Sequence, residues 1–246
     1  MKKLYLFANW KMYLDAAESE KLAREFEEIS YPKRSKVVVF PSALVIEELV
    51  PIFKKTKISF GAQNTYWADK GAYSGEISAA MYRDVGCSYA LVGHAERRHK
   101  FHESDEDTRL KMEAILKLKM TPVLCVGETE EERKNNKTEE VLERQLSVAY
   151  RGLVWPKGIE LLIAYEPVWA IGTGESCSPT EAERVCSLVS GWTRKFLGVE
   201  PAILYGGSVA AENISDYVSQ SHIQGVLVGG ASAKKASWVS LIKKLS

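Results

Sequence analysis

Eight short runs rich in aliphatic and aromatic residues recur along the chain, and their arrangement limits the possible fold more than any other feature. Several runs are apolar at consecutive positions instead of alternating, which is typical of parallel strands covered on both faces. The runs are LYLFAN (4–9), KVVVF (36–40), ISFGAQ (58–63), YALVG (89–93), TPVLCVG (121–127), ELLIAY (160–165), AILYG (202–206) and GVLVG (225–229).

Helical patterns lie between these runs, with apolar residues near helical spacing over 15–30, 103–119, 138–150 and 178–196. The last of them opens with Ser178, Pro179 and Glu181, a combination that predicts a helix start. Eight strand–helix units in 246 residues without a linker predict an α/β protein, a single closed (β/α)8 barrel over 1–246. A doubly wound open sheet is the alternative.

Composition excludes several partners. Thirty-three basic residues against 32 acidic ones give a net charge of +1, so no global field favours nucleic acid or an anionic membrane. The N-terminal run LYLFA is too short for a signal peptide, and no segment approaches the roughly 20 apolar residues of a membrane span. The four cysteines have no CxxC spacing and lie in or near apolar runs. We therefore expect a soluble, cytoplasmic protein with reduced, buried thiols.

Polar residues follow several of the predicted strands, where catalytic groups of such barrels lie. Asn9 and Lys11 follow the first strand, His94 and Glu96 the fourth, and Glu166 the sixth. Glycine-rich loops follow the seventh and eighth, and glycines let backbone N–H groups approach phosphate oxygens. A base, a proton donor and a cation beside such loops suit proton transfer on a phosphorylated anion.

Each residue also has an ordinary structural explanation when taken alone. A glutamate at a strand end is commonly a salt-bridged surface group, a histidine can cap a helix, and glycine pairs mark tight turns. Lys11 could be a surface lysine or could form a Schiff base, as in an aldolase. His94, His99 and His102, with Glu103 nearby, have no recognised ligand spacing, so we expect no metal.

Motifs along the whole chain resemble the triosephosphate isomerase family. They are FANWKM (7–12), GAQNTYW (61–67), GEIS (75–78), LVGHAERR (91–98), ESDE (103–106), AYEPVWAIGTG (164–174), YGGSV (205–209) and GVLVGGAS (225–232). The resemblance implies a TIM barrel that interconverts dihydroxyacetone phosphate and D-glyceraldehyde 3-phosphate without metal or organic cofactor.

The resemblance also implies a role for each matching residue. Glu166 would be the base and a neutral His94 the electrophile, with Lys11 offsetting charge, Asn9 orienting the site and Glu96 supporting catalysis. Phosphate would bind backbone N–H groups of Gly172, Ser208, Gly229 and Gly230 under a lid formed by Pro167 to Cys177. The loop around Ser74 would insert beside the site of a second copy, giving a homodimer.

The sequence departs from the family's usual pattern at a few positions. Ala95 stands where serine is usual, and Glu175-Ser176-Cys177 replaces the commoner Lys-Thr-Ala type at the far hinge of the lid. Gln224 stands where aspartate is frequent, so an ion pair is expected to be missing. Ala95 and the hinge motivate an alternative function, a phosphate-binding barrel with impaired catalysis.

Overall fold

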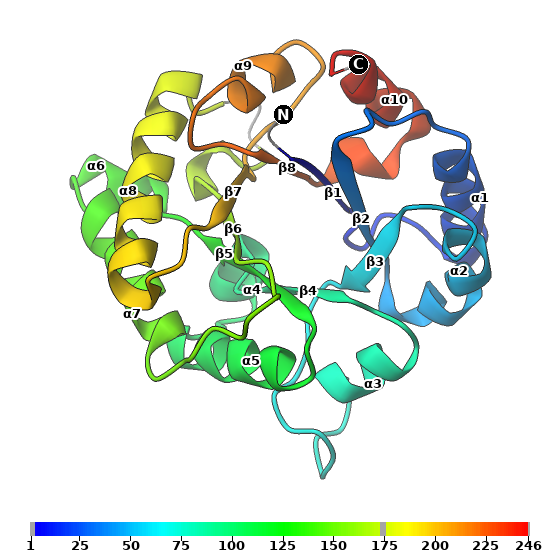
Figure 1. The fold of residues 1–246 in the computed structure, drawn as a ribbon, viewed down its shortest axis with the longest axis horizontal. Helices are drawn as coiled ribbons and strands as arrows, with labels where there is room; N and C mark the ends of the chain where they lie inside the picture. Colours follow the sequence, from blue (N-terminus) through cyan, green and yellow to red (C-terminus); the bar gives the residue numbers. More distant parts are fainter. Residues whose placement is uncertain (1–2, 173–175, 246) are drawn as a thin grey trace.

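A closed ring of eight parallel strands forms the centre of the computed structural model, with helices around it (Figure 1). The structure describes residues 3–172 and 176–245. The strands are β1 (Leu4–Asn9), β2 (Ser35–Phe40), β3 (Ser59–Ala62), β4 (Tyr89–Val92), β5 (Thr121–Val126), β6 (Leu162–Tyr165), β7 (Ala202–Tyr205) and β8 (Gly225–Val228).

The pairing of β1 with both β2 and β8 closes the ring. Leu4 lies opposite Ser35 on one side, and Tyr5 lies opposite Gly225 on the other. This closure confirms the predicted barrel, and the open sheet considered as an alternative is wrong. We infer that 1–246 form one domain, because the first and last strands are neighbours and any division of the chain would open the ring.

Each of the eight predicted runs overlaps a strand. β2 begins one residue before its run, at Ser35, and most of the other strands are shorter than their runs. The final glycines of the runs, such as Gly93 and Gly206, lie in loops, and Gly93 turns the chain at a φ of +69°. The predicted start of the sixth strand at Glu160 is wrong, because pairing with β5 begins only at Leu162. A strand begins and ends where hydrogen-bonded pairing with the neighbouring strand begins and ends. A run of apolar residues does not show where that pairing is.

The helices complete each unit. They are α1 (Ala16–Glu27), α2 (Ile46–Phe53), α3 (Ala79–Asp84), α4 (Ala95–Lys100), α5 (Asp105–Lys117), α6 (Glu130–Lys134), α7 (Thr138–Tyr150), α8 (Pro179–Leu197), α9 (Ile214–Val218) and α10 (Lys235–Lys243), with short 3-10 turns η1 (Ala43–Val45), η2 (Val168–Ala170) and η3 (Gly230–Ala233). Within the described residues, none of them is both long and apolar enough to cross a membrane.

The predicted helix starts depend on caps. Ser178 accepts a hydrogen bond from the Glu181 amide and Pro179 is the first helical residue, as predicted. The predicted helix at 103–119 starts later, at Asp105, because Ser104 and Asp107 form a capping box. The predicted helix at 15–30 ends at Glu27, so its last residues lie outside the helix.

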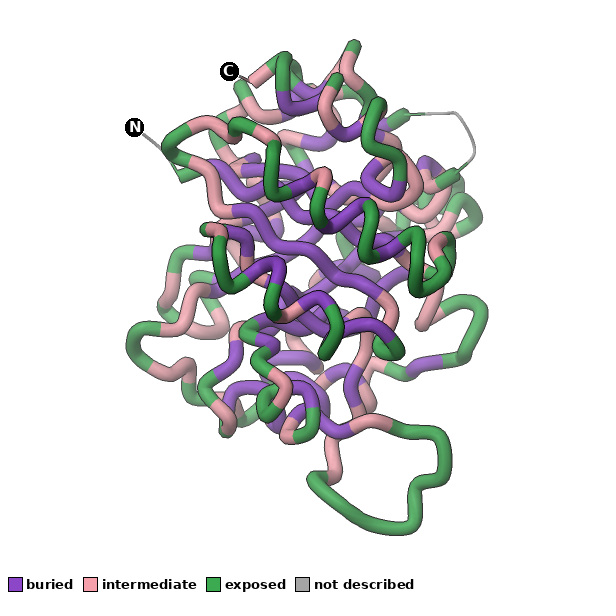
Figure 2. The backbone as a smooth tube through the Cα atoms, turned by 90° about the vertical axis from the view of Figure 1, so that its right-hand side faces the viewer, coloured by how far each residue is buried: buried purple, intermediate pink, exposed green. Residues whose placement is uncertain are grey.

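Two apolar layers explain why the strands are apolar at consecutive positions. Tyr5 and Phe7 belong to a cluster with Val38 and Tyr89, whereas Leu6 belongs to the larger cluster that includes residues of the surrounding helices. Successive strand residues point to opposite faces, so a strand in a barrel places one residue inside and the next beneath a helix. Buried strands accordingly lie beneath partly exposed helices (Figure 2).

One loop departs from this compact arrangement. The segment between β3 and α3 projects beyond the ring of helices (Figure 1), and residues 69–76 in it are exposed (Figure 2). Tyr66 stacks on Trp67 at 4.1 Å and packs against Tyr73 at 4.6 Å between ring centroids. These aromatic contacts, all between side chains of the loop itself, stabilise its conformation.

Two glycine substitutions test the closure of the barrel. A Cβ on Gly225 would lie 2.0 Å from the carbonyl oxygen of Tyr5, in the β1–β8 pair, whereas one on Gly191 in α8 would meet nothing within 4 Å. We expect Gly225→Ala to lower the free energy of unfolding by about 3 kcal/mol or more. Gly191→Ala should raise it by about 0.5–1 kcal/mol, because alanine favours the helix. Urea unfolding measures both, and equal effects would contradict this account.

Candidate active site

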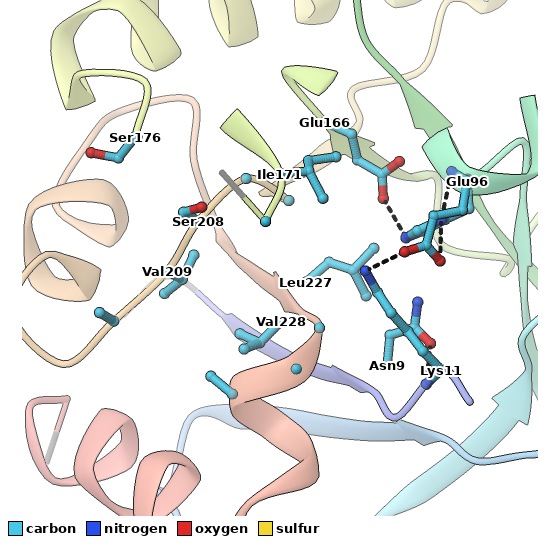
Figure 3. Close-up of a pocket in the computed structure, with 18 of the residues that line it drawn as sticks. Asn9, Lys11, Glu96, Glu166, Ile171, Ser176, Ser208, Val209, Leu227 and Val228 are labelled. Atoms are coloured by element: carbon cyan, nitrogen blue, oxygen red, sulfur yellow. Dashed lines mark hydrogen bonds and ion pairs between the residues drawn. The ribbon is translucent and has the colours of Figure 1, made fainter. Parts of the chain in front are cut away.

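A cavity of about 650 Å³ opens at the carboxyl ends of the strands (Figure 3). It brings together the residues that the sequence singles out: Asn9, Lys11, His94, Glu96, Glu166, Gly172, Ser208, Gly229 and Gly230. These come from both ends and the middle of the chain. Their proximity follows from the barrel, which gathers the strand ends at one mouth.

Glu166 follows β6 and is 1% exposed. Its Oε2 accepts a hydrogen bond of 2.7 Å from the backbone N–H of Ala95, and its Oε1 lies 3.3 Å from Nε2 of His94. Oε1 has no hydrogen-bond partner among the described residues. Glu166 is also one of the residues that line the cavity, so the wall of the cavity holds a carboxylate with one oxygen left without a hydrogen bond from the described residues.

Two glycines leave room for Glu166. A Cβ on Gly206 would lie 2.8 Å from Cγ of Glu166, and one on Gly127 would lie 1.7 Å from its carbonyl oxygen. Gly206 and Gly127 lie at the ends of the two strands that flank β6. The position of the carboxylate therefore depends on missing side chains on both neighbouring strands.

His94 stands at the N-cap of α4, and its ring accepts a hydrogen bond there. Nδ1 accepts from the backbone N–H of Glu96 at 3.2 Å. A ring nitrogen that accepts a hydrogen bond carries no proton, so we assign the proton to Nε2 and a neutral imidazole. The Nε2–H then lies on the side of Glu166.

Lys11 is held in a left-handed conformation, with φ of +50°. Its backbone N–H donates to Oδ1 of Asn9 at 3.1 Å, and its carbonyl accepts from Nε2 of Gln63 at 2.8 Å. The Gln63 amide also donates to the carbonyl of Phe40, which ties the loop after β1 to the end of β2. These bonds offset the roughly 1–2 kcal/mol cost of the left-handed conformation.

An ion pair joins Lys11 to Glu96, with Nζ and Oε1 2.9 Å apart (Figure 3). Burial raises the pKa of Glu96, but the hydrogen bond and charge of Lys11, helped by the charge of Lys100, hold that pKa below its ordinary value. Glu96 is therefore ionised at neutral pH. Lys11 also crosses Gly229, where a Cβ would lie 2.9 Å from its Cε.

The glycine-rich loops line the opposite side of the cavity. The backbone N–H of Ser208 donates to the carbonyl of Ala170 at 3.0 Å, and its hydroxyl donates to the same oxygen at 2.6 Å. Phosphate binding through the Ser208 N–H would require this bond to be exchanged. The predicted phosphate contacts stay predictions.

Further residues line the cavity although sequence reasoning did not select them as site residues, among them Tyr13, Lys100 and Asn213. Gln63 is not among the lining residues, but it contributes to the site because it fixes the backbone of Lys11. Its position within GAQNTYW, one of the motifs that carry the resemblance, was the available signal. No comparable signal marked Asn213.

The family model for triosephosphate isomerase matches residues 4–245. The chain belongs to the triosephosphate isomerase family. It is 40% identical to the triosephosphate isomerase of Dictyoglomus turgidum over 251 aligned positions, which cover 99% of this chain and 100% of the relative. The Nostoc sp. enzyme of the same name is 40% identical with both chains fully covered, and that of Trichodesmium erythraeum is 41% identical with 98% and 99% covered.

Three of the departures from the family pattern have identifiable surroundings in the structure. Ala95 lacks a hydroxyl, but Glu166 is bonded to its backbone N–H, which any residue except proline provides. Gln224 accepts a hydrogen bond of 2.6 Å from the backbone N–H of Ile203. At the far hinge of the predicted lid, Ser176 lines the cavity and the carbonyl of Cys177 accepts from the Tyr217 hydroxyl. Residues 173–175 of the predicted lid, which include Glu175, lie outside the described residues.

Glu128 follows β5 but is absent from the cavity lining. It is 1% exposed, and its carboxylate accepts hydrogen bonds from the Tyr165 hydroxyl at 3.2 Å and the Trp169 indole at 2.8 Å. Burial raises the pKa of Glu128 above 4.5, although these hydrogen bonds oppose the shift. Glu128 thus connects the end of β6 to η2.

The raised pKa of Glu128 predicts a pH dependence of stability. A carboxyl group whose folded-state pKa exceeds its unfolded value stabilises the fold less as the pH rises through the two values. We therefore expect the unfolding free energy of Glu128→Gln, compared with that of wild type, to increase as the pH is raised from 4.5 to values above the raised pKa of Glu128. Urea unfolding at a series of pH values measures the difference. A difference that stays constant or changes in the opposite direction would contradict the assignment.

Proposed function

We propose that this protein interconverts dihydroxyacetone phosphate and D-glyceraldehyde 3-phosphate through an enediolate, without a metal or organic cofactor. The observation that carries the proposal is the meeting of the Glu166 carboxylate with the neutral His94 ring at 3.3 Å in the cavity, near the Lys11–Glu96 pair. Membership of the family gives the identity of the substrates.

The groups in the cavity suit each step. Glu166 takes the proton from the carbon beside the carbonyl, and the electron pair of that C–H bond moves toward the carbonyl oxygen. The Nε2–H of His94 stabilises the negative charge that develops on this oxygen. Protons then shift between the two oxygens, and Glu166 returns a proton to the neighbouring carbon. No external oxidant or reductant is needed, because one carbon is reduced as the other is oxidised.

The remaining predicted residues bind the substrate and orient the groups of the site. Lys11 offsets the negative charge of the substrate, and Asn9 orients the site and fixes the backbone of Lys11. Glu96 acts in two ways: its carboxylate pairs with Lys11 and its N–H fixes the His94 tautomer. Phosphate binds the backbone N–H groups of Gly172, Ser208, Gly229 and Gly230. A neutral histidine as electrophile is a recognised feature of this family.

We also propose a homodimer in which the loop around Ser74 reaches the partner subunit. The exposed residues 69–76 and the projection of this loop from the barrel support the assignment (Figure 1). A cytoplasmic location is proposed as well. Its support is that all four cysteines are free and buried, as predicted, which suits a reducing compartment.

An isomerase assay tests the proposed activity. Purified protein should convert glyceraldehyde 3-phosphate to dihydroxyacetone phosphate in a coupled assay, and Glu166→Ala should lower kcat by about 10²- to 10⁴-fold because it removes the base. Circular dichroism should show that the variant is folded. Turnover no faster than that of Glu166→Ala would rule out the enzyme and would leave a barrel that only binds phosphate compounds.

Sedimentation equilibrium tests the dimer. The chain has a mass of 27.5 kDa, so a dimer doubles the observed mass. Ser74→Arg places a charge in the proposed interface and should shift the protein toward the monomer at micromolar concentration. Val154→Arg adds the same charge at an exposed position on another loop, before β6, and should have no such effect. A monomeric wild type would refute the proposal.

A further inference from the structure

Asn213 occupies the N-cap position of α9, yet its side chain does not cap that helix. An asparagine at this position ordinarily accepts a hydrogen bond from the second or third residue of its own helix. Here Oδ1 instead accepts from the backbone N–H of Ala210 at 2.9 Å, and Nδ2 donates to the carbonyl of Ser208 at 3.3 Å. The carboxamide therefore binds the loop before the helix, not the helix.

This loop lies between two fixed groups. On one side, Ser208 donates both its N–H and its hydroxyl to the carbonyl of Ala170 in η2. On the other side, Asn213 binds the Ser208 carbonyl and the Ala210 N–H. If the Ser208 N–H turns to a ligand, the Ala170 bond is lost and Asn213 still holds both ends of the Ser208–Ala210 turn.

Asn213 also lines the cavity, together with Ser208, Val209 and Ala210. We propose that Asn213 is a positioning residue for the anionic end of the substrate: its carboxamide shapes the Ser208–Ala210 turn that presents the backbone N–H to phosphate. This inference rests on the proposed function and extends it. It assigns the role to a side chain that acts through the backbone of the loop.

The side-chain chemistry gives matched variants. A carboxamide supplies both the acceptor for Ala210 and the donor for Ser208, whereas a carboxylate only accepts. Asn213→Asp therefore keeps the acceptor for the Ala210 N–H, and aspartate is as good an N-cap residue as asparagine. It removes the donor to the Ser208 carbonyl and places a negative charge beside that oxygen and in the anion site. Asn213→Ala removes both bonds without adding charge. Glu212→Gln, at the exposed neighbouring residue, is the control.

The experiment measures steady-state kinetics, calorimetric binding of inorganic phosphate and thermal unfolding for the four proteins. For Asn213→Ala we expect KM and the phosphate Kd to rise roughly fivefold, with kcat within about twofold of wild type. For Asn213→Asp we expect rises of about tenfold or more in both constants at a Tm close to that of wild type. Glu212→Gln should match wild type throughout.

Two results would overturn the inference. One is a wild-type KM and phosphate Kd in Asn213→Asp; the other is a fall in Tm and kcat with unchanged phosphate affinity, which indicates a purely structural role. Failure of the proposed function is distinguishable, because wild-type protein would then show no turnover. In that case phosphate binding alone decides the inference, and equal phosphate Kd values in wild type and both Asn213 variants would refute it.

Discussion

Hydrogen bonding of β1 to both β2 and β8 makes the sheet a ring, and the geometry of the site depends on that ring. The ring brings Lys11 from the first unit beside Gly229 from the last, where an added Cβ would force the Lys11 side chain to move. It also places the end of β6 between Gly127 and Gly206, where the Glu166 side chain and backbone occupy the space of the missing Cβ atoms. Packing of backbone against side chain at the barrel mouth thus fixes where the charged groups point.

The first turn of α4 organises the chemistry with backbone groups. The N–H of Ala95 binds one oxygen of Glu166, and the next N–H, that of Glu96, binds Nδ1 of His94. Such free N–H groups occur at every helix start, where they lack partners within the helix. Here two successive ones orient the base and the electrophile toward each other. The Glu96 side chain then holds Lys11, so one short segment positions three charged or polar side chains.

The sequence predicted the barrel because consecutive apolar residues and helix caps are local signals. The 138–150 helix and the Ser178 cap agree with the structure for this reason. Gln63 and Asn213 were not predicted as functional, because both bind backbone groups that carry no side-chain signature. Gln63 bonds to the end of β2 and to the loop after β1, and the Ser208 N–H donates to Ala170 of the preceding unit. Such contacts exist only after the strands are arranged in space.

The bond between Glu166 and the backbone of Ala95 has an evolutionary consequence. Because the main chain makes this hydrogen bond, the bond depends on where the helix starts and not on a particular side chain. Substitutions at position 95 therefore leave it intact unless they introduce proline. This contact therefore depends on the shape of the segment from Gly93 to Glu96 and sets no requirement on the side chain at position 95. Chains with different residues at this position can therefore share one geometry of the base.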